Sequence, residues 1–233
     1  MKKNLFILLL LSCLAFSACH SPQEDALFQF SGTLEMTEHG VGFPMQGRLA
    51  ALYVEEGDNV QQGQLLGYLD HYELAKKEYQ RLDQLFKEGG THQQAVEKAQ
   101  QAMLDQQAIS PVDGVVLTKV HETGEVLSSN NILVIIGDRQ SLWVRIFVPE
   151  GLINRVKLGQ SAQLRFDGLK ESFSGKVEFI APQAEFTPRN VQTPEERVTQ
   201  TFAVKVYLEH PPQQLRPGVP ADVFLELPQT LSQ

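Results

Sequence analysis

The side chains that could carry catalysis or hold a metal are few and widely spaced in this sequence. Its six histidines include no pair four residues apart and have no carboxylates at a spacing that suggests zinc. Asp58 and Glu125 each follow a glycine in two similar segments, which indicates acidic turn residues rather than an acid–base pair. No G-x-S-x-G, Walker A or G-x-G-x-x-G motif occurs. The sequence therefore predicts no enzyme, no metal site and no cofactor.

The thiol of Cys19 is the one reactive group in a recognisable setting. Two lysines near the start are followed by an apolar run, Leu5 to Ala18, which is too short to span a bilayer, since a spanning helix needs about 20 residues. This pattern is typical of an export signal. Small residues directly before Cys19 resemble the bacterial lipobox, which implies removal of residues 1–18 and acylation of Cys19. Acylation at Cys13, or cleavage after Ala18 without a lipid, are the alternatives.

The composition of the whole chain limits which classes of protein are possible. The chain has 233 residues, 42% of them hydrophobic and 13 of them phenylalanine, which is enough for folded cores. The net charge of −8 disfavours a nucleic-acid partner, because phosphate binding requires a basic face. Both cysteines lie at or before position 19, so the chain beyond it can form neither a disulfide nor a thiolate metal site.

An internal repeat organises the elements that must position any functional residue. Its two units align at one constant separation without a gap, so that Gly57 matches Gly124 and Leu66 matches Leu133. Each unit predicts an apolar strand, a turn that contains glycine and an acidic residue, and a second apolar strand. Glycine suits such a turn because it adopts positive φ without strain. We assign structural roles at these turns to matched residues of the two units: Gly47, Gly57, Asp58, Gly114, Gly124 and Glu125.

The two units resemble the halves of a lipoyl/biotinyl-type domain, a flattened barrel of two interlocking four-stranded halves. Gly47–Leu66 matches the first half and Ser110–Asp138 the second. Carrier members of that fold present a lysine between the halves for lipoate or biotin. This chain instead has a long insertion there, His71 to Ile109, without a matching lysine motif. A carrier subunit is therefore disfavoured.

The inserted segment 71–109 is predicted to form a helical hairpin. Its first arm has an apolar seam with 3-4-3-4 spacing, and a glycine pair then ends the helix before Thr91, the predicted N-cap of the second arm. Each arm of about 18 residues would be roughly 27 Å long. A two-helix arm with no partner remains the alternative. The predicted seam residues are Tyr72, Ala75, Tyr79, Leu82 and Phe86, facing Ala95, Ala99, Ala102 and Ile109.

A lipoyl-like domain split by a helical hairpin resembles the HlyD family of membrane fusion proteins, also called periplasmic adaptors. The resemblance continues downstream through Ser141–Glu150, Val156–Leu164, Gly175–Ile180 and Leu215–Val223. It implies a hexameric adaptor that links an inner-membrane transporter to a TolC-like outer-membrane channel. The segment Phe186–Val198 resembles the YbhG-like subgroup, whose members accompany ABC-type exporters.

The resemblance also suggests which residues meet the channel. Family members that dock onto a TolC-like channel carry an Arg, a Leu four residues on and a Ser seven beyond that. Arg81 and Leu85 match the first two, and His92 stands in place of the Ser. We assign docking to these three residues with Glu88 and Gly89 at the tip. Stabilisation of the tip alone is the other interpretation of Arg81 and Leu85.

The predicted fold is mainly β, with a lipoyl-like domain interrupted by a helical hairpin and followed by a β-barrel domain. Residues 26–40 and the final strand are expected to form a membrane-proximal module.

The expected location is the periplasm of a Gram-negative bacterium, on the inner rather than the outer membrane. A transporter-accessory or substrate-binding lipoprotein is the alternative function. The predicted boundaries are 1–18 for the signal, 19–40 for the anchor segment and first strand, 41–70 plus 110–138 for the lipoyl-like domain, 71–109 for the hairpin, 139–227 for the barrel region and 228–233 for the tail.

Overall fold

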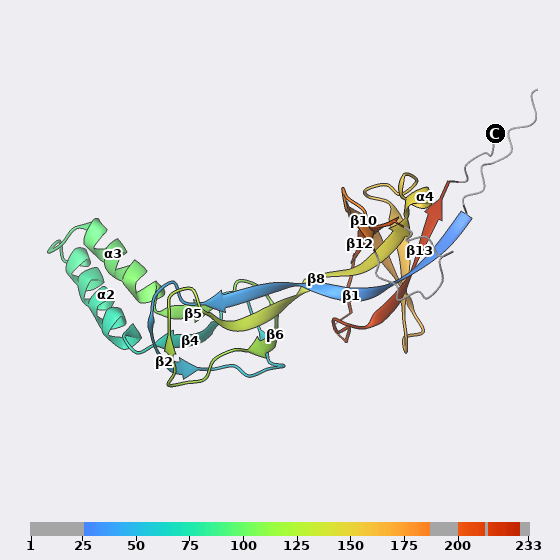
Figure 1. Cartoon of the computed structure of the whole chain (residues 1–233). Helices are drawn as coiled ribbons and strands as arrows, with labels where there is room; N and C mark the ends of the chain where they lie inside the picture. Colours follow the sequence, from blue (N-terminus) through green and yellow to red (C-terminus); the bar gives the residue numbers. More distant parts are fainter. Residues whose placement is uncertain (1–25, 187–199, 213, 229–233) are drawn as a thin grey trace, which may run out of the picture.

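The computed structural model of this protein describes residues 26–186, 200–212 and 214–228. Figure 1 shows an elongated molecule with a helical hairpin at one end, a small β domain in the middle and a β-barrel at the other end. Two long strands, β1 (Ala26–Gly42) and β8 (Ile132–Pro149), run through both β domains. Within the described ranges, no helix has the length and apolar character needed to cross a membrane.

The strands of the middle domain reproduce the sequence repeat residue for residue. The first unit forms β2 (Gly47–Leu52), β3 (Asn59–Val60) and β4 (Leu65–Leu69). The second forms β6 (Gly114–Lys119), β7 (Val126–Leu127) and the start of β8. Each strand of the second unit begins at the residue that matches the start of its counterpart in the first.

The two units interlock rather than pack side by side. Strand β2 pairs with β7 of the other unit, and β6 pairs with β3. The turns follow the same symmetry, because the Gly57 N–H donates to the Val116 carbonyl and the Gly124 N–H to the Leu49 carbonyl, both at 2.8 Å. Gly57 and Gly124 have φ of +90° and +97°, a region that favours glycine. The predicted flattened barrel of interlocking halves is confirmed.

Gly47 and Gly114 have a different role from the turn role predicted for them. Each begins a strand, and neither has positive φ. A Cβ at Gly114 would overlap the Gly137 carbonyl oxygen and lie 2.7 Å from Cγ2 of Ile136. At Gly47 it would meet the Leu69 side chain at 2.9 Å. Close strand packing, rather than a turn, requires these two glycines.

We expect Gly114→Ala to lower the free energy of unfolding by about 1–3 kcal/mol, because a carbonyl fixed in a strand pair cannot move away from the new methyl group. Urea unfolding of the mature chain measures this. Gly151→Ala is the matched control, since Gly151 lies in the short helix α4 (Glu150–Ile153) with nothing within 4 Å of its added Cβ. Equal stabilities of the two variants would contradict the packing argument.

The second β domain is a closed antiparallel barrel of six strands. Their order is β12, β10, β9, β13, β1 and β8, and the pairing of β8 with β12 closes the ring. The prediction placed residues 26–40 and the final strand in a membrane-proximal module, whereas Ala26–Thr33 and β13 are neighbouring strands of this barrel. The remaining bounds are β9 (Ser161–Phe166), β10 (Ser172–Ile180), β11 (Glu185–Phe186), β12 (Gln200–Leu208) and β13 (Pro220–Leu227).

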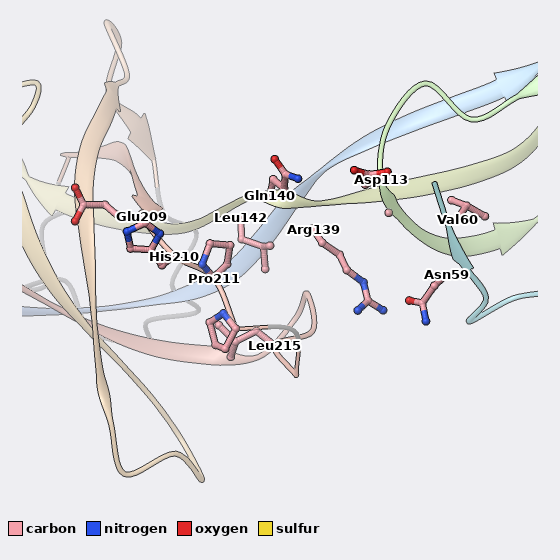
Figure 2. A pocket seen from close by; sticks show the side chains of 12 residues that line it. Asn59, Val60, Asp113, Arg139, Gln140, Leu142, Glu209, His210, Pro211 and Leu215 are labelled. Carbon is pink, nitrogen blue, oxygen red and sulfur yellow. The ribbon is translucent and has the colours of Figure 1, made fainter. Parts of the chain in front are cut away.

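The junction between the β domains lies inside β1 and β8, not in a loop. Met36 pairs with Leu142 and Glu38 with Gly137, so Thr37 alone stands opposite the segment Asp138–Ser141. The Thr37 and Ser141 hydroxyls are 2.7 Å apart across this bulge. Figure 2 shows Arg139 and Gln140 of the bulge in the space between the domains.

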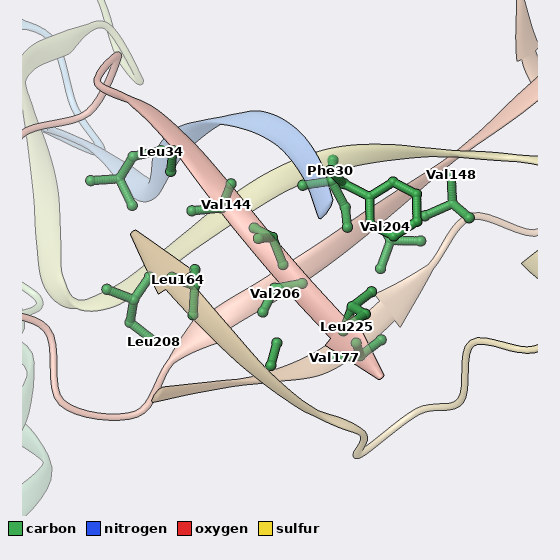
Figure 3. Close-up of a cluster of buried hydrophobic side chains, with 14 of the residues drawn as sticks. Phe30, Leu34, Val144, Val148, Leu164, Val177, Val204, Val206, Leu208 and Leu225 are labelled. Atoms are coloured by element: carbon green, nitrogen blue, oxygen red, sulfur yellow. The ribbon is translucent and has the colours of Figure 1, made fainter. Parts of the chain in front are cut away.

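Two separate hydrophobic cores hold the β domains. The barrel core receives buried side chains from all six of its strands, as Figure 3 shows for Phe30, Leu34, Val144, Val148, Leu164, Val177, Val204, Val206, Leu208 and Leu225. Val144, Val177 and Val206 have no exposed surface. The alternation of buried and exposed residues along β9 matches the period of two of a strand with one face inside.

The hairpin is shorter than predicted. Helix α2 (Tyr72–Lys87) has 16 residues and α3 (Gln93–Leu104) has 12, which correspond to about 24 Å and 18 Å. The chain then re-enters the middle domain through β5 (Gln107–Ile109), which pairs with β4. His92, not Thr91, is the N-cap of α3, and its side chain makes no capping hydrogen bond.

The helices pack along part of the predicted seam. Tyr72 at the start of α2 and Ala99 in the middle of α3 are buried. Phe86, predicted in the seam, is 42% exposed near the tip. Ile109 was assigned to the second helix but lies in β5 with 36% of its surface exposed. Phe86 is thus still helical but largely unburied, whereas Ile109 falls outside the seam because α3 ends at Leu104.

Candidate functional site

The tip of the hairpin is a compact turn closed by its own backbone. Glu88 caps α2, Gly89 adopts φ of +75°, and the Gly90 N–H donates to the Leu85 carbonyl at 2.7 Å. This satisfies carbonyls that would otherwise lack partners at the end of the helix. The Glu88 carboxylate accepts a hydrogen bond from the Gln84 amide at 3.0 Å. The tip thus presents a short, ordered turn with exposed polar groups.

Arg81 lies about two turns before the tip and is paired within its own helix. Its Nε and Nη2 donate to the two carboxylate oxygens of Glu78 at 2.9 and 2.6 Å. The side chains remain 60% and 49% exposed. This bond from Arg81 lowers the pKa of Glu78 and raises the pKa of Arg81. Any partner of Arg81 must therefore compete with a charged carboxylate already in place.

We expect Arg81→Gln to raise the pKa of Glu78 towards its ordinary value, because the substitution removes the cation that stabilises the carboxylate. A carboxylate whose pKa is lower in the folded than in the unfolded chain stabilises the fold at pH values above its unfolded pKa. This stabilisation is lost as the pH falls through the pKa of the folded state. The pair is therefore intact at neutral pH. An NMR titration of the Glu78 carboxyl carbon in both proteins measures the change, and identical titration curves would contradict the pair.

The other predicted docking residues lie nearby in sequence but do not form one polar cluster. Leu85 is half-buried, with its Cδ2 3.7 Å from the point where Gly90 would carry a Cβ. His92 is exposed and begins α3. In the part of the chain that the structure describes, no hydrogen bond joins His92 to Arg81. Cys19, the predicted lipidation site, lies outside the described residues.

An open cleft of about 710 Å³ between the two β domains was not predicted from the sequence. Arg139 extends into it from the bulge, and Figure 2 shows His210 and Pro211 on the barrel side with Asn59 and Asp113 on the other. The only sequence signal was the polar run Asp138–Ser141 between two apolar stretches. Among the described residues, no group of three or more His, Cys, Asp or Glu could hold a metal ion.

The described chain combines a six-stranded barrel, joined through two shared strands, with an interlocked sandwich that carries an α-hairpin. Two family models agree with this architecture. Residues 40–138 match the RND MFP barrel-sandwich hybrid domain, and residues 141–229 match the CusB-like β-barrel domain. The chain belongs to the membrane fusion protein family.

Curated relatives carry only general names. The UPF0194 membrane protein in the asrC 5′ region of Acidithiobacillus ferridurans is 36% identical over 130 residues, which cover 55% of this chain and 38% of that protein. UPF0194 membrane protein YbhG of Salmonella gallinarum is 24% identical over 297 positions, covering 87% of this chain and 89% of the relative. Because this chain has only 233 residues, many of those 297 positions hold a residue only in the relative.

Solved structures share the fold at low sequence identity. A MacA–MexA chimeric protein with the Pseudomonas aeruginosa MexA α-hairpin domain aligns with a TM-score of 0.60 at 21% identity, over 87% of this chain and 82% of that one. The membrane fusion protein Spr0693 of Streptococcus pneumoniae aligns with a TM-score of 0.59 at 15% identity, over 87% and 100%.

Proposed function

We propose that this protein is the periplasmic adaptor of an efflux or secretion system, bridging an inner-membrane transporter and an outer-membrane channel. One observation carries the proposal: the hairpin tip and the start of β1 lie at opposite ends of the elongated molecule. The N-terminal end would stay at the inner membrane through an acylated Cys19, and the hairpin would point towards the outer membrane. In enteric bacteria, an Asp directly after the acylated Cys retains a lipoprotein in the inner membrane, and this chain has His20 at that position. The inner membrane is therefore assigned from the adaptor role and not from this residue.

The transporter partner is proposed to be of the ABC type rather than the RND type. Support comes from the resemblance of Phe186–Val198 to the YbhG-like subgroup, and from the match to YbhG over 87% of the chain. Of that segment only Phe186 lies within the described residues. The description of the family model for residues 40–138 names RND systems, so both classes belong in any search for the transporter.

The channel contact is assigned to the tip, with Arg81, Leu85, Glu88, Gly89 and His92 as docking residues on a TolC-like protein. An exposed guanidinium can make charge-assisted hydrogen bonds to carbonyls or carboxylates, and a leucine can enter an apolar groove between helices. The Ser expected by the family pattern is replaced by an imidazole, which also donates hydrogen bonds. Six copies arranged as a ring, as the family resemblance implies, would present six such tips.

The experiment is photo-cross-linking in living cells from position 88, with the partners identified by mass spectrometry. Glu88 suits the probe because its side chain is exposed at the tip. Position 74 in the same helix, where Leu74 is 69% exposed but far from the tip, is the control. Capture of an outer-membrane channel from position 88 alone is the expected result. Adducts with only the transporter or with other copies of the chain would contradict channel bridging.

The short hairpin favours a second candidate, an accessory lipoprotein that serves a transporter without reaching a channel. Helices of about 24 and 18 Å give a short reach, and the relatives that align along most of this chain are longer proteins. A substrate-binding lipoprotein belongs to the same group. The cross-linking experiment separates these from the bridging adaptor, and an intact mass without lipoate or biotin would exclude a carrier subunit.

A further inference from the structure

We infer that the barrel end farthest from the hairpin, built from Leu27, Arg155, Lys157 and Leu158, rests directly on the lipid bilayer. We name these four residues the barrel-end patch. The inference rests on the proposed lipid anchor and adds a contact that the anchor alone does not provide. Arg155, Lys157 and Leu158 lie in the loop that joins α4 to β9. Figure 1 shows α4 beside the start of β1 and the end of β13.

Two leucines give the patch its apolar character. Leu158 is 67% exposed and Leu27 is 63% exposed, although both belong to a well-packed domain. Leu27 stands opposite Glu226 in the β1–β13 pair, and Glu226 lines the same open hollow of about 530 Å³ as Leu158. A single exposed leucine is ordinary on a protein surface, but here Leu158 in the hollow and Leu27 beside Glu226 add two exposed apolar side chains to surroundings that are otherwise mostly polar.

Two cations flank these leucines. Arg155 places its guanidinium over the Phe28 ring at 5.2 Å, donates to the Leu227 carbonyl at 3.3 Å and lines the hollow, so this charge is held partly buried against the barrel. Lys157 is exposed directly before Leu158. Lysine and arginine beside apolar residues suit a bilayer surface, where the charge meets phosphate and the stem lies in the interface. Glu226 and Glu150 lie nearby and offset the two positive charges of Arg155 and Lys157. Contact of the leucines with lipid, rather than attraction of net charge, must therefore provide most of the binding.

The reach of the anchor places the patch at the membrane. Ala26, the first residue of β1, is seven residues after Cys19, and seven residues span at most about 25 Å. A lipid on Cys19 would therefore keep the barrel end within that distance of the bilayer. A tether of this length leaves the molecule free to tilt. Contact through Leu27 and Leu158 would restrict the tilt and point the hairpin away from the membrane.

The test places an environment-sensitive fluorophore on the patch of the mature lipoprotein in vesicles. Once residues 1–18 are removed and Cys19 is acylated, Leu158→Cys provides the only free thiol. Leu74→Cys is the matched control, because Leu74 is exposed to the same extent, 69% against 67%, but lies in the hairpin. We expect blue-shifted emission and quenching by spin-labelled lipids at position 158 and neither effect at position 74. Adding Leu27→Glu should reduce the quenching at position 158.

The outcomes separate the contact from the anchor. Flotation of the labelled protein with the vesicles reports the anchor, and a second reactive thiol would show that Cys19 is not acylated. A protein that floats while the position-158 probe stays in water would overturn the membrane contact and leave the anchor intact. Shielding of position 158 only in native membranes, and not in pure lipid vesicles, would also overturn it and indicate a protein partner.

Discussion

Arg81→Glu is expected to abolish most of the cross-linking between the hairpin tip and an outer-membrane channel. The substitution replaces the proposed docking cation with a carboxylate beside Glu78, whose oxygens accept two hydrogen bonds from Arg81 in the unmodified protein. Loss of one charge-assisted hydrogen bond lowers affinity on the order of tenfold, and like charges add to this loss. The amount of adduct captured from position 88, and export of the substrate once known, measure the effect.

The fold should tolerate this change, because both side chains are largely exposed and exposed ion pairs contribute little to stability. Lys77→Glu is the control, since it changes the charge by the same amount one turn away on α2, and Lys77 is exposed too. Normal capture of a channel by the Arg81→Glu protein would exclude the docking role. Equal losses in both variants would show that only the overall charge of the helix matters.

Leu133→Ala is expected to lower the free energy of unfolding by about 2–5 kcal/mol, the usual cost of a cavity left by a buried leucine. Leu133 has no exposed surface and belongs to the core of the middle domain. Its counterpart in the first unit of the repeat, Leu66, is equally buried in the same core. We therefore expect Leu66→Ala to cost a similar amount, because the two halves contribute to one cluster. Urea unfolding of the mature chain measures both.

The control for the core prediction is Val126→Ala in β7. Val126 belongs to the same domain but is 69% exposed, so its truncation should change stability by less than about 1 kcal/mol. A Leu133→Ala protein as stable as Val126→Ala would mean that the interlocked core does not hold this domain. A large loss for Leu133→Ala with none for Leu66→Ala would contradict a core to which the two halves contribute equally.

The repeat allowed the fold of the middle domain to be predicted from the sequence. Strand starts at a constant separation, and turn glycines at positions 57 and 124, follow from local chemistry: apolar alternation predicts a strand, and only glycine adopts positive φ without strain. The absence of a carrier-type lysine motif between the halves and the pattern of the inserted hairpin were also local signals. These signals were sufficient to predict the fold class and the family.

Local sequence patterns gave wrong predictions where the role of a residue depends on contacts with residues far away in the chain. Gly47 and Gly114 occupy the same place in the repeat, yet the added Cβ would meet a side chain in one case and a backbone carbonyl in the other. The first helix ends at the predicted glycine break, but the second was placed with Thr91 as its N-cap and extended to Ile109, whereas α3 has His92 as its N-cap and ends at Leu104, because the chain then joins the sheet as β5. Glu78 gave no signal, since its role follows only from its geometry beside Arg81.

The sequence by itself determined where most strands and the two helices lie, that two halves repeat, and that the chain resembles the membrane fusion proteins. Tertiary structure decided how those parts connect. Strands β1 and β8 pass through both β domains, and a bulge opposite Thr37 borders the interdomain cleft. Glu226, the strand partner of Leu27, lines the same hollow as Leu158 although the two are far apart in the chain. Such proximities arise from strand pairing over long sequence distances, which no local pattern of residues specifies.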